Sequence, residues 1–399
     1  MSEPAVDVAI VGGGLVGASL ALALANTPLK LALIEAAAPP VSVPAWDERC
    51  IALNDASRRI FAALNIWDEL ATQAAPITAT HISERGRFGV ARFNAAEAKL
   101  DALGHNTPLR ALGALLLARA QAQANLQWFC PARVQGITLA SNGAQLTLDS
   151  DARINAKLVV AADGASSALR ALLGLGAEVR DYQQSAVVTA VRVQRDPNGV
   201  AYERFTPMGP FAVLPKPRLL DDSAEGHPCS LIWTLPTARA EALHGVPETD
   251  FIAEAQQVFG ERLGRFLAIG RRIAYPLYRT VSETLTAPRV VFCGNAAQSL
   301  HPVAAQGFNL GLRDVHCLAA RLSQATDPGA AALLADYAAS RADDRRHTAD
   351  FTDQLVRLFS NRLPVVSSLR HLGLLAMDLV PSAKDAVLRQ NLGHRGLMA

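Results

Sequence analysis

The sequence has few cysteines and little net charge, and each scarcity narrows the possible functions. Its five cysteines are far apart, and none forms a C-x-x-C pair. This spacing argues against a metal cluster or a disulfide framework and favours a reducing cytoplasm. The formal net charge is only +2, so nothing indicates a nucleic-acid partner. No basic segment precedes the first apolar run, so we do not expect a signal peptide.

Residues 8–25 carry no charge and approach the length of a membrane span, about 18 residues or more. Three consecutive glycines, Gly12, Gly13 and Gly14, interrupt this run. Three consecutive glycines would destabilise a lipid-exposed helix. We therefore interpret the run as a buried strand at 6–11, a glycine turn, and a buried helix at 18–25.

This first turn fits G-x-G-x-x-G at Gly12, Gly14 and Gly17. In dinucleotide-binding folds the first glycine permits the tight turn, the second admits a pyrophosphate, and the third lets helix and strand pack closely. A second apolar strand ends at Glu35, about 20 residues further on, where an acid can accept hydrogen bonds from a ribose. These residues predict a bound nucleotide but do not distinguish FAD from NAD.

Two later segments repeat the order of strand, turn and helix. An apolar run ends at Asp163, which is either a ligand or only a turn former. A second run at 290–292 is followed by Gly294, Asn295 and Pro302, and then by a helix that begins near Gln306. We expect the three turns to converge on one crevice that holds a large, extended cofactor.

The middle of the chain predicts a second, antiparallel sheet. Its expected strands are residues 186–193, 201–205, 211–215 and 229–235. A hairpin is expected around 85–89, a helix at 248–266, and a long helix at 330–359. We expect the mixed charges at 341–347 to form a solvated face. The apolar tail from residue 364 either covers the second sheet or rests on a membrane surface.

The three turns, in this order, resemble the class A flavoprotein aromatic hydroxylases, which have the para-hydroxybenzoate hydroxylase fold. Within that class the chain is similar to the ubiquinone-biosynthesis branch, and there to the 2-polyprenyl-6-methoxyphenol hydroxylases. The segments that suggest this branch are 47–53, 81–86, 203–206, 209–210 and 294–298. Three residues depart from the wider class: Asn295 replaces an Asp, Gln298 a His, and Ala305 a Gly.

The resemblance implies an α/β fold in which a Rossmann-like FAD-binding domain is joined to an α+β domain with an antiparallel substrate-binding sheet. The FAD-binding domain would comprise residues 1–75, 98–180 and 276–345. The substrate domain would comprise 76–97 and 181–275. A helical C-terminal segment would follow at 346–399.

The resemblance also assigns roles to single residues. Gly12, Gly13, Gly14 and Gly17 would admit the pyrophosphate, and Glu35 would hold the adenosine ribose. Arg49 and Arg110 would lie along the cofactor, although surface or structural roles fit both equally well. Asp163, Gly294 and Asn295 would support the flavin and ribityl chain, and Gly307, Phe308 and Asn309 would offer backbone N–H groups to the ring. Pro302 would line the oxygen-reacting face. His301 would be either a proton relay or a structural residue, and no metal site is expected.

The implied reaction is hydroxylation of a polyprenylated phenol with O2, using bound FAD and transiently docked NADH or NADPH. Two alternatives remain: a related flavin-dependent epoxidase or reductase, and a non-catalytic flavoprotein subunit of a quinone-synthesis assembly. The expected location is the cytoplasm, with peripheral contact at the inner membrane surface left open. Homo-oligomers and contacts with other ubiquinone-biosynthesis proteins are left open too.

Overall fold

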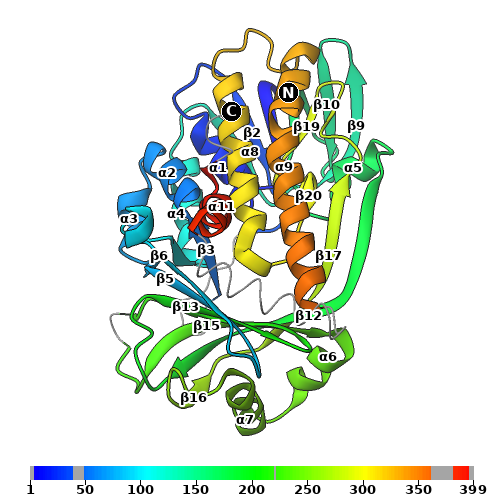
Figure 1. The fold of residues 1–399 in the computed structure, drawn as a ribbon. Coiled ribbons are helices and arrows are strands. Elements are labelled where there is room, and N and C mark those ends of the chain that lie inside the picture. The colour runs from blue at the N-terminus through cyan, green and yellow to red at the C-terminus, as the bar shows by residue number, and fades with distance from the viewer. Residues whose placement is uncertain (1–3, 39–48, 220–221, 361–380, 395–399) are drawn as a thin grey trace.

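The computed structural model describes residues 4–38, 49–219, 222–360 and 381–394. Two large sheets lie one above the other, with helices packed on each (Figure 1). A proline-containing loop predicted at 36–46 lies largely outside the described residues, as does most of the apolar tail predicted from residue 364.

The first sheet is built around strands that are buried on both faces, as expected for near-continuous apolar runs. Its central strands run in the order β19-β11-β1-β2-β8 and are mutually parallel. They are β1 (Ala5–Val11), β2 (Leu31–Ile34), β8 (Leu126–Phe129), β11 (Arg153–Ala161) and β19 (Val290–Phe292). Antiparallel additions are β18 (Thr286–Ala287) and the hairpin of β9 (Val134–Ala140) and β10 (Gly143–Leu148).

Three helices pack together on this sheet, with α1 (Leu15–Ala23) in contact with both α4 (Leu109–Gln121) and α8 (Gln306–Leu322). The short α5 (Ala168–Leu172) follows β11. The 3-10 turns η2 (Gly294–Ala296) and η3 (Val303–Ala305) connect β19 to α8. The core of this part contains the fully buried strands and the inward faces of α1, α4 and α8.

The second sheet has the order β20-β17-β12-β15-β14-β13-β5-β6, with β16 paired to β12. Its strands are β5 (Ala79–Glu84), β6 (Val90–Asn94), β12 (Ala177–Val193), β13 (Val200–Thr206), β14 (Gly209–Pro215), β15 (His227–Pro236), β16 (Phe266–Ile269), β17 (Ile273–Ser282) and β20 (Gln298–Ser299). The four strands expected in an antiparallel sheet pair antiparallel in the order β12-β15-β14-β13, and β5 joins them parallel to β13. The β5–β6 hairpin comes from much earlier in the chain, so its direction is not set by a tight turn to β13.

Helices α6 (Thr237–Gly245) and α7 (Glu248–Phe259) cover the face of this sheet that points away from the first sheet (Figure 1). The predicted helix at 248–266 was too long. Gly260 follows α7 with a positive φ of 84°. Glycine adopts such a conformation easily, and helices often end at a glycine of this kind. Of the remaining residues of the predicted helix, only Phe266 joins the sheet, as the first residue of β16.

A small third sheet, β3 (Cys50–Asn54), β7 (Gly104–Pro108) and β4 (Ala75–Ile77), lies beside helices α2 (Asp55–Ala63) and α3 (Trp67–Ala71). The turn η1 (Ala96–Ala98) follows β6. The long helix α9 (Ala331–Ser360) runs beside α8, and α11 (Pro381–Leu392) lies in front of α8 and packs near β6 (Figure 1). Among the described residues, no helix is both long enough and apolar enough to cross a bilayer.

The predicted solvated face at 341–347 is wrong in its most important residue. Arg341 is fully buried and pairs with Asp314 of α8 at 2.8 Å and with Asp344 at 2.7 Å. Arg313 also pairs with Asp344, at 2.8 Å. Burial alone would raise the pKa of Asp344, but the two arginines outweigh it and lower that pKa. We name Arg313, Asp314, Arg341 and Asp344 the α8–α9 clamp.

Candidate cofactor and substrate site

The carboxyl ends of β1, β11 and β19 lie next to one another, which brings the three predicted turns together. Ala162 N–H donates to the Val11 carbonyl at 2.8 Å, and Cys293 N–H donates to the Ala161 carbonyl at 2.9 Å. A Cβ on Gly294 would lie 2.8 Å from Val16 of α1. The expected convergence of the turns is therefore confirmed, and it places a crevice where ligands bind in open α/β sheets.

The glycines of the first turn meet different surroundings. Gly12 has φ of 104°, and a Cβ there would lie 2.4 Å from the Ala162 carbonyl oxygen. A Cβ on Gly17 would lie 1.9 Å from the Gly12 carbonyl oxygen. Gly14, in contrast, would meet nothing within 4 Å. The chain itself thus requires glycine at positions 12 and 17, whereas at Gly14 the missing side chain leaves open space of the kind that a pyrophosphate needs.

Glu35 reaches back to this turn. One carboxylate oxygen accepts from Gly13 N–H at 2.6 Å and the other from Ala37 N–H at 2.8 Å. Each oxygen keeps a lone pair for a further donor. The carboxylate is therefore held in place beside the glycines and retains the capacity to accept from ribose hydroxyls.

The second turn contains a buried polar atom that the described protein does not satisfy. Asp163 Oδ2 accepts from Leu169 N–H at 3.1 Å, whereas Oδ1 is buried without a hydrogen-bond partner among the described residues. Ser167 caps α5 by accepting from Arg170 N–H. Buried carboxylate oxygens rarely lack partners. A hydroxyl of a bound cofactor would satisfy Oδ1, so the residues fit such a group.

The third turn exposes Asn295 between buried neighbours, and Asn295 lines the large cavity described below. Gly307 in the first turn of α8 would meet nothing within 4 Å if it carried a Cβ. Backbone N–H groups in the first turn of a helix lack intrahelical partners and carry partial positive charge. The start of α8, with Gly307 and Phe308 on the cavity wall, can therefore bind the electron-rich edge of a ring.

The side chain of Asn309 has a structural role that the sequence did not suggest. Its Oδ1 accepts from Asn54 N–H and Ser57 Oγ, and its Nδ2 donates to the carbonyls of Ala52 and Ala305. These four bonds tie the start of α8 to β3 and α2. The buried amide thereby holds the helix start in position.

A cavity of about 690 Å³ separates this turn from the second sheet. Alternate residues of the sheet line it, whereas the residues between them pack under α6 and α7. The lining includes Thr80, Ile82, Ala186, Val188, Ala201, Glu203, Ala212, Leu214, Ile232, Thr234 and Leu277 from the sheet, and Pro302, Val303, Phe308, Leu388 and Leu392 from the opposite side. The cavity is thus mainly apolar.

Two predicted arginines differ in their relation to this cavity. Arg49 lines it, donates to the Tyr275 hydroxyl, and stacks over that ring with 5.4 Å between the guanidinium carbon and the ring centroid. Arg110 lies half-buried in the first turn of α4 and is not among the lining residues.

Pro302 lines the cavity but the neighbouring His301 does not. His301 is 1% exposed, its Nδ1 accepts from Val303 N–H at 3.1 Å, and its ring packs edge-on against Tyr182. Burial lowers the pKa of His301 to about 4. Of the two roles considered, this packing favours the structural one.

Glu203 is the one carboxylate among the described residues that line the cavity. Across the sheet it faces Ala212 on β14 and Ile82 on β5. It makes no hydrogen bond or ion pair with a described residue, and burial raises its pKa to about 7. The motif at 203–206 was noticed in the sequence, but no role was assigned to it. A charged residue in the middle of a half-buried strand was the available signal.

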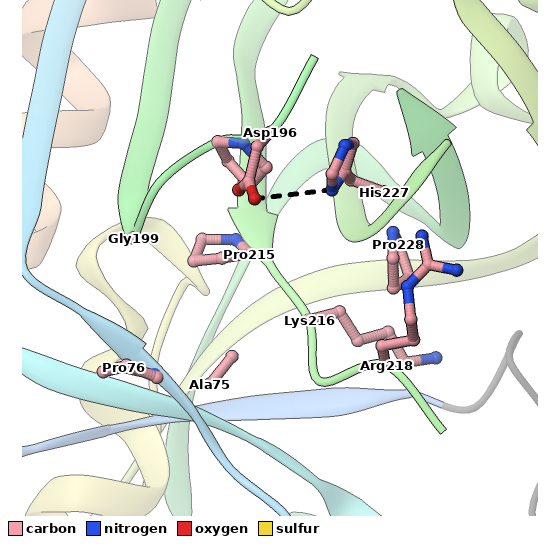
Figure 2. Close-up of a pocket in the computed structure, with 10 residues that line it drawn as sticks. Ala75, Pro76, Asp196, Gly199, Pro215, Lys216, Arg218, His227 and Pro228 are labelled. Atoms are coloured by element: carbon pink, nitrogen blue, oxygen red, sulfur yellow. Dashed lines mark ion pairs between the residues drawn. The ribbon is translucent and has the colours of Figure 1, made fainter. Parts of the chain in front are cut away.

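A smaller cavity of about 260 Å³ lies behind β14, where Asp196 and His227 face each other at 3.5 Å (Figure 2). Lys216 and Arg218 also line it. None of the residues predicted for the cofactor site contributes to it, whereas residues of the third turn line the larger cavity.

A sequence profile of the FAD binding domain family matches residues 5–352. The chain belongs to this FAD-binding family of flavin hydroxylases. It is 36% identical to the ubiquinone hydroxylase UbiL of Rhodospirillum rubrum, over 98% of this chain and 90% of that protein. It is 34% identical to the 3-demethoxyubiquinol 3-hydroxylase of Escherichia coli, over 98% of this chain and all of that protein (100%).

The fold is shared with a solved structure, Pseudomonas aeruginosa PqsL in complex with 2-aminobenzoylacetate, with a TM-score of 0.77 and 20% identity. That similarity covers 93% of this chain and 99% of PqsL. The predicted membership in the ubiquinone-biosynthesis branch of the class A flavin hydroxylases is confirmed, as is the α/β fold. FAD is the cofactor of this flavin hydroxylase, and use of NAD(P)H is typical of the family.

Proposed function

We propose that this flavin hydroxylase adds a hydroxyl group to the aromatic ring of a polyprenylated phenol of the 2-polyprenyl-6-methoxyphenol class during ubiquinone biosynthesis. One oxygen atom of O2 enters the ring and the other leaves as water, with two electrons supplied by NAD(P)H. The cavity between α8 and the second sheet carries this proposal, because it is mainly apolar, is lined by residues of the third turn, and has a single carboxylate among its described lining residues.

Bound FAD would supply the redox chemistry, namely acceptance of electrons from NAD(P)H and activation of O2. Gly14, Glu35, Asp163 and Asn295 would hold it, for the reasons given above. The first turn of α8 would stabilise negative charge on the ring. Pro302, Val303 and Phe308 would exclude water from the reacting face. Because Arg110 is not on the cavity wall, we assign it no contact with the reacting ring.

Glu203 would accept the hydrogen bond, and then the proton, of the phenol hydroxyl. Loss of that proton makes the ring more electron-rich and favours its attack on oxygen. A carboxylate with a pKa of about 7 is suited to general base work near neutral pH. The apolar neighbours of Glu203 leave the substrate as its hydrogen-bond partner.

The same proposal divides the chain as the sequence predicted. Residues 1–75, 98–180 and 276–345 would bind FAD, and residues 76–97 and 181–275 would bind the phenol. The observed sheets support this division, because the β5–β6 hairpin pairs with β13 and not with the first sheet.

The decisive experiment incubates the FAD-loaded protein with the phenol, NAD(P)H and O2. We expect substrate-stimulated NAD(P)H oxidation and a product heavier by one oxygen in mass spectrometry. An epoxidised or saturated isoprenoid chain would favour the related epoxidase or reductase instead. Flavin-loaded protein that leaves every phenol unchanged would favour a non-catalytic subunit. Quinone precursors that accumulate when the gene is removed would identify the ring position.

Glu203→Gln tests the assigned base. General base catalysis contributes typically 10²–10⁴-fold, so we expect kcat to fall by about 100-fold or more with little change in KM or flavin content. Glu261→Gln, at an exposed position, is the control. An unchanged kcat and pH profile in Glu203→Gln would exclude proton transfer to this residue.

A further inference from the structure

The face of the second sheet that points away from the cavity carries unpaired positive charge near its β6 edge. Thr80 and Ile82 of β5 line the cavity, so His81 and Arg85 belong to the other face. We call Arg85, Arg92, Arg204 and Arg262 the arginine cluster. His81, opposite Arg92 on β6, lies among them.

The arginine cluster has no ion pair or side-chain hydrogen bond with the described residues. Burial, Arg262 and Arg85 lower the pKa of Arg204, and burial together with Arg262, Arg92 and Arg204 lowers the pKa of His81 to about 4. Arg204 Nε and both ring nitrogens of His81 are buried without partners among the described residues. The acids next to these arginines in sequence are Glu84, which is buried, Glu203, which lines the cavity on the other face, and Glu261. The mutual repulsion of the arginines favours an anionic partner.

The β5–β6 hairpin tip adds an apolar element to this charge. Phe88 at the tip is 97% exposed, more than any other large hydrophobic side chain in the described part of the chain. Arg85 and Arg87 flank it in sequence. An aromatic side chain presented among cations is typical of surfaces that lie in the interface of anionic bilayers.

We propose that the arginine cluster and Phe88 dock the protein on an anionic phospholipid surface. The inference rests on the proposed function, because a polyprenylated phenol dissolves in the bilayer. One strand, β5, contributes both to this surface and to the substrate cavity, so docking would bring the cavity close to the membrane that holds the substrate. A soluble phosphate compound could use the arginines, but it would leave Phe88 without a role.

The test is sedimentation of the FAD-loaded full chain with vesicles of phosphatidylcholine, with and without phosphatidylglycerol. We expect binding only to the anionic vesicles, weakening as salt increases. Neutralising the half-buried Arg85 and the exposed Arg92 and Arg262 together, in Arg85→Gln/Arg92→Gln/Arg262→Gln, should weaken binding by about 100-fold. Phe88→Ser should weaken it by about 10-fold, through loss of the buried ring. Equal binding to both vesicles, or unchanged binding by these variants, would overturn the proposal.

Two matched variants serve as controls. Arg346→Gln removes an exposed arginine elsewhere, and Val179→Ser removes an exposed apolar side chain elsewhere; both should bind as the wild type does. Inorganic phosphate at constant ionic strength should have no more effect than chloride. Strong competition by phosphate, together with normal vesicle binding by Phe88→Ser, would assign the cluster to a soluble phosphate ligand instead.

The outcome can be separated from that of the proposed function. With a short-chain phenol dispersed in detergent, the docking variants should hydroxylate as fast as the wild type. If the wild type itself hydroxylates no phenol but still binds anionic vesicles through these residues, the proposed function fails and the docking surface stands.

Discussion

At the level of single residues, Gly12 and Gly17 are required by the fold, whereas Gly14 is proposed to be required by the cofactor. Gly14→Val should fold normally, because a Cβ at this position meets nothing within 4 Å, but its side chain should occupy the space proposed for the pyrophosphate. We expect colourless protein with an unchanged melting temperature in the absence of flavin. Gly245→Val, another glycine that faces open space, should stay yellow. Full flavin retention by Gly14→Val would contradict our placement of the pyrophosphate.

Ala305 shows why the wider class has glycine at its position. Its φ is 49°, in the left-handed region that costs an L-residue about 1 kcal/mol or more. Ala305→Gly should therefore increase the free energy of unfolding by about 1 kcal/mol, measured by chemical denaturation. The same change at Ala297, where φ is −86°, should reduce it. Destabilisation of equal size at both positions would show that the backbone at Ala305 is unstrained.

At the level of elements, the α8–α9 clamp positions the third turn as well as the helices. Asp314 accepts from Arg341 on one oxygen and from Gln298 Nε2, at 2.9 Å, on the other. Gln298 also accepts from Arg345 of α9. Gln298 belongs to the segment that contains Asn295, so the orientation of that segment depends on a helix later in the chain.

Arg341→Met should cost about 3–5 kcal/mol of stability, because it leaves the fully buried Asp314 without its charge partner. Flavin affinity should fall as well, which titration of the unloaded protein with FAD would measure. The control is Arg119→Met, which breaks a half-exposed pair with Glu69 and should cost less than about 1 kcal/mol. Similar losses for the two variants would mean that the clamp contributes no more than a surface pair.

At the level of the whole molecule, buried histidines should make stability fall in acid. Burial lowers the pKa of His81, His105 and His301 to about 4 each. Since their unfolded pKa is near 6.5, the unfolded chain binds more protons between pH 6.5 and 4, and stability is lost as the pH falls through this window. Each contributes on the order of 1–3 kcal/mol.

Glu203 acts in the opposite direction, because its pKa is raised to about 7 and stability is lost as the pH rises from about 4.5 to 7. Chemical denaturation across a pH series should show a steep fall in the free energy of unfolding below pH 6.5. His301→Gln should flatten that slope, and Glu203→Gln should increase stability above pH 7. A flat profile between pH 4 and 6.5 in the wild type would contradict the burial of these histidines.

Much of the cofactor half could be predicted because its signals are local. An apolar run that ends in glycine specifies a buried strand and a tight turn through nearby residues alone, and three such turns on parallel strands must meet at one edge of a sheet. Two charged residues, one in the substrate half and one in the cofactor half, were harder to predict. Glu203 and Arg341 are both charged residues within regular elements, and their environment depends on which distant face covers them.

The sequence by itself determined the Rossmann-like half, the order of its turns and the family, because close backbone approach permits only certain residues at 12 and 17. Only the tertiary structure decided that β5 runs parallel to β13, that Arg341 is buried in a clamp, and that Glu203 faces the cavity. The physical reason is that these features arise from the pairing of surfaces far apart in the chain, and an amino-acid pattern records which residues are polar without recording what they meet.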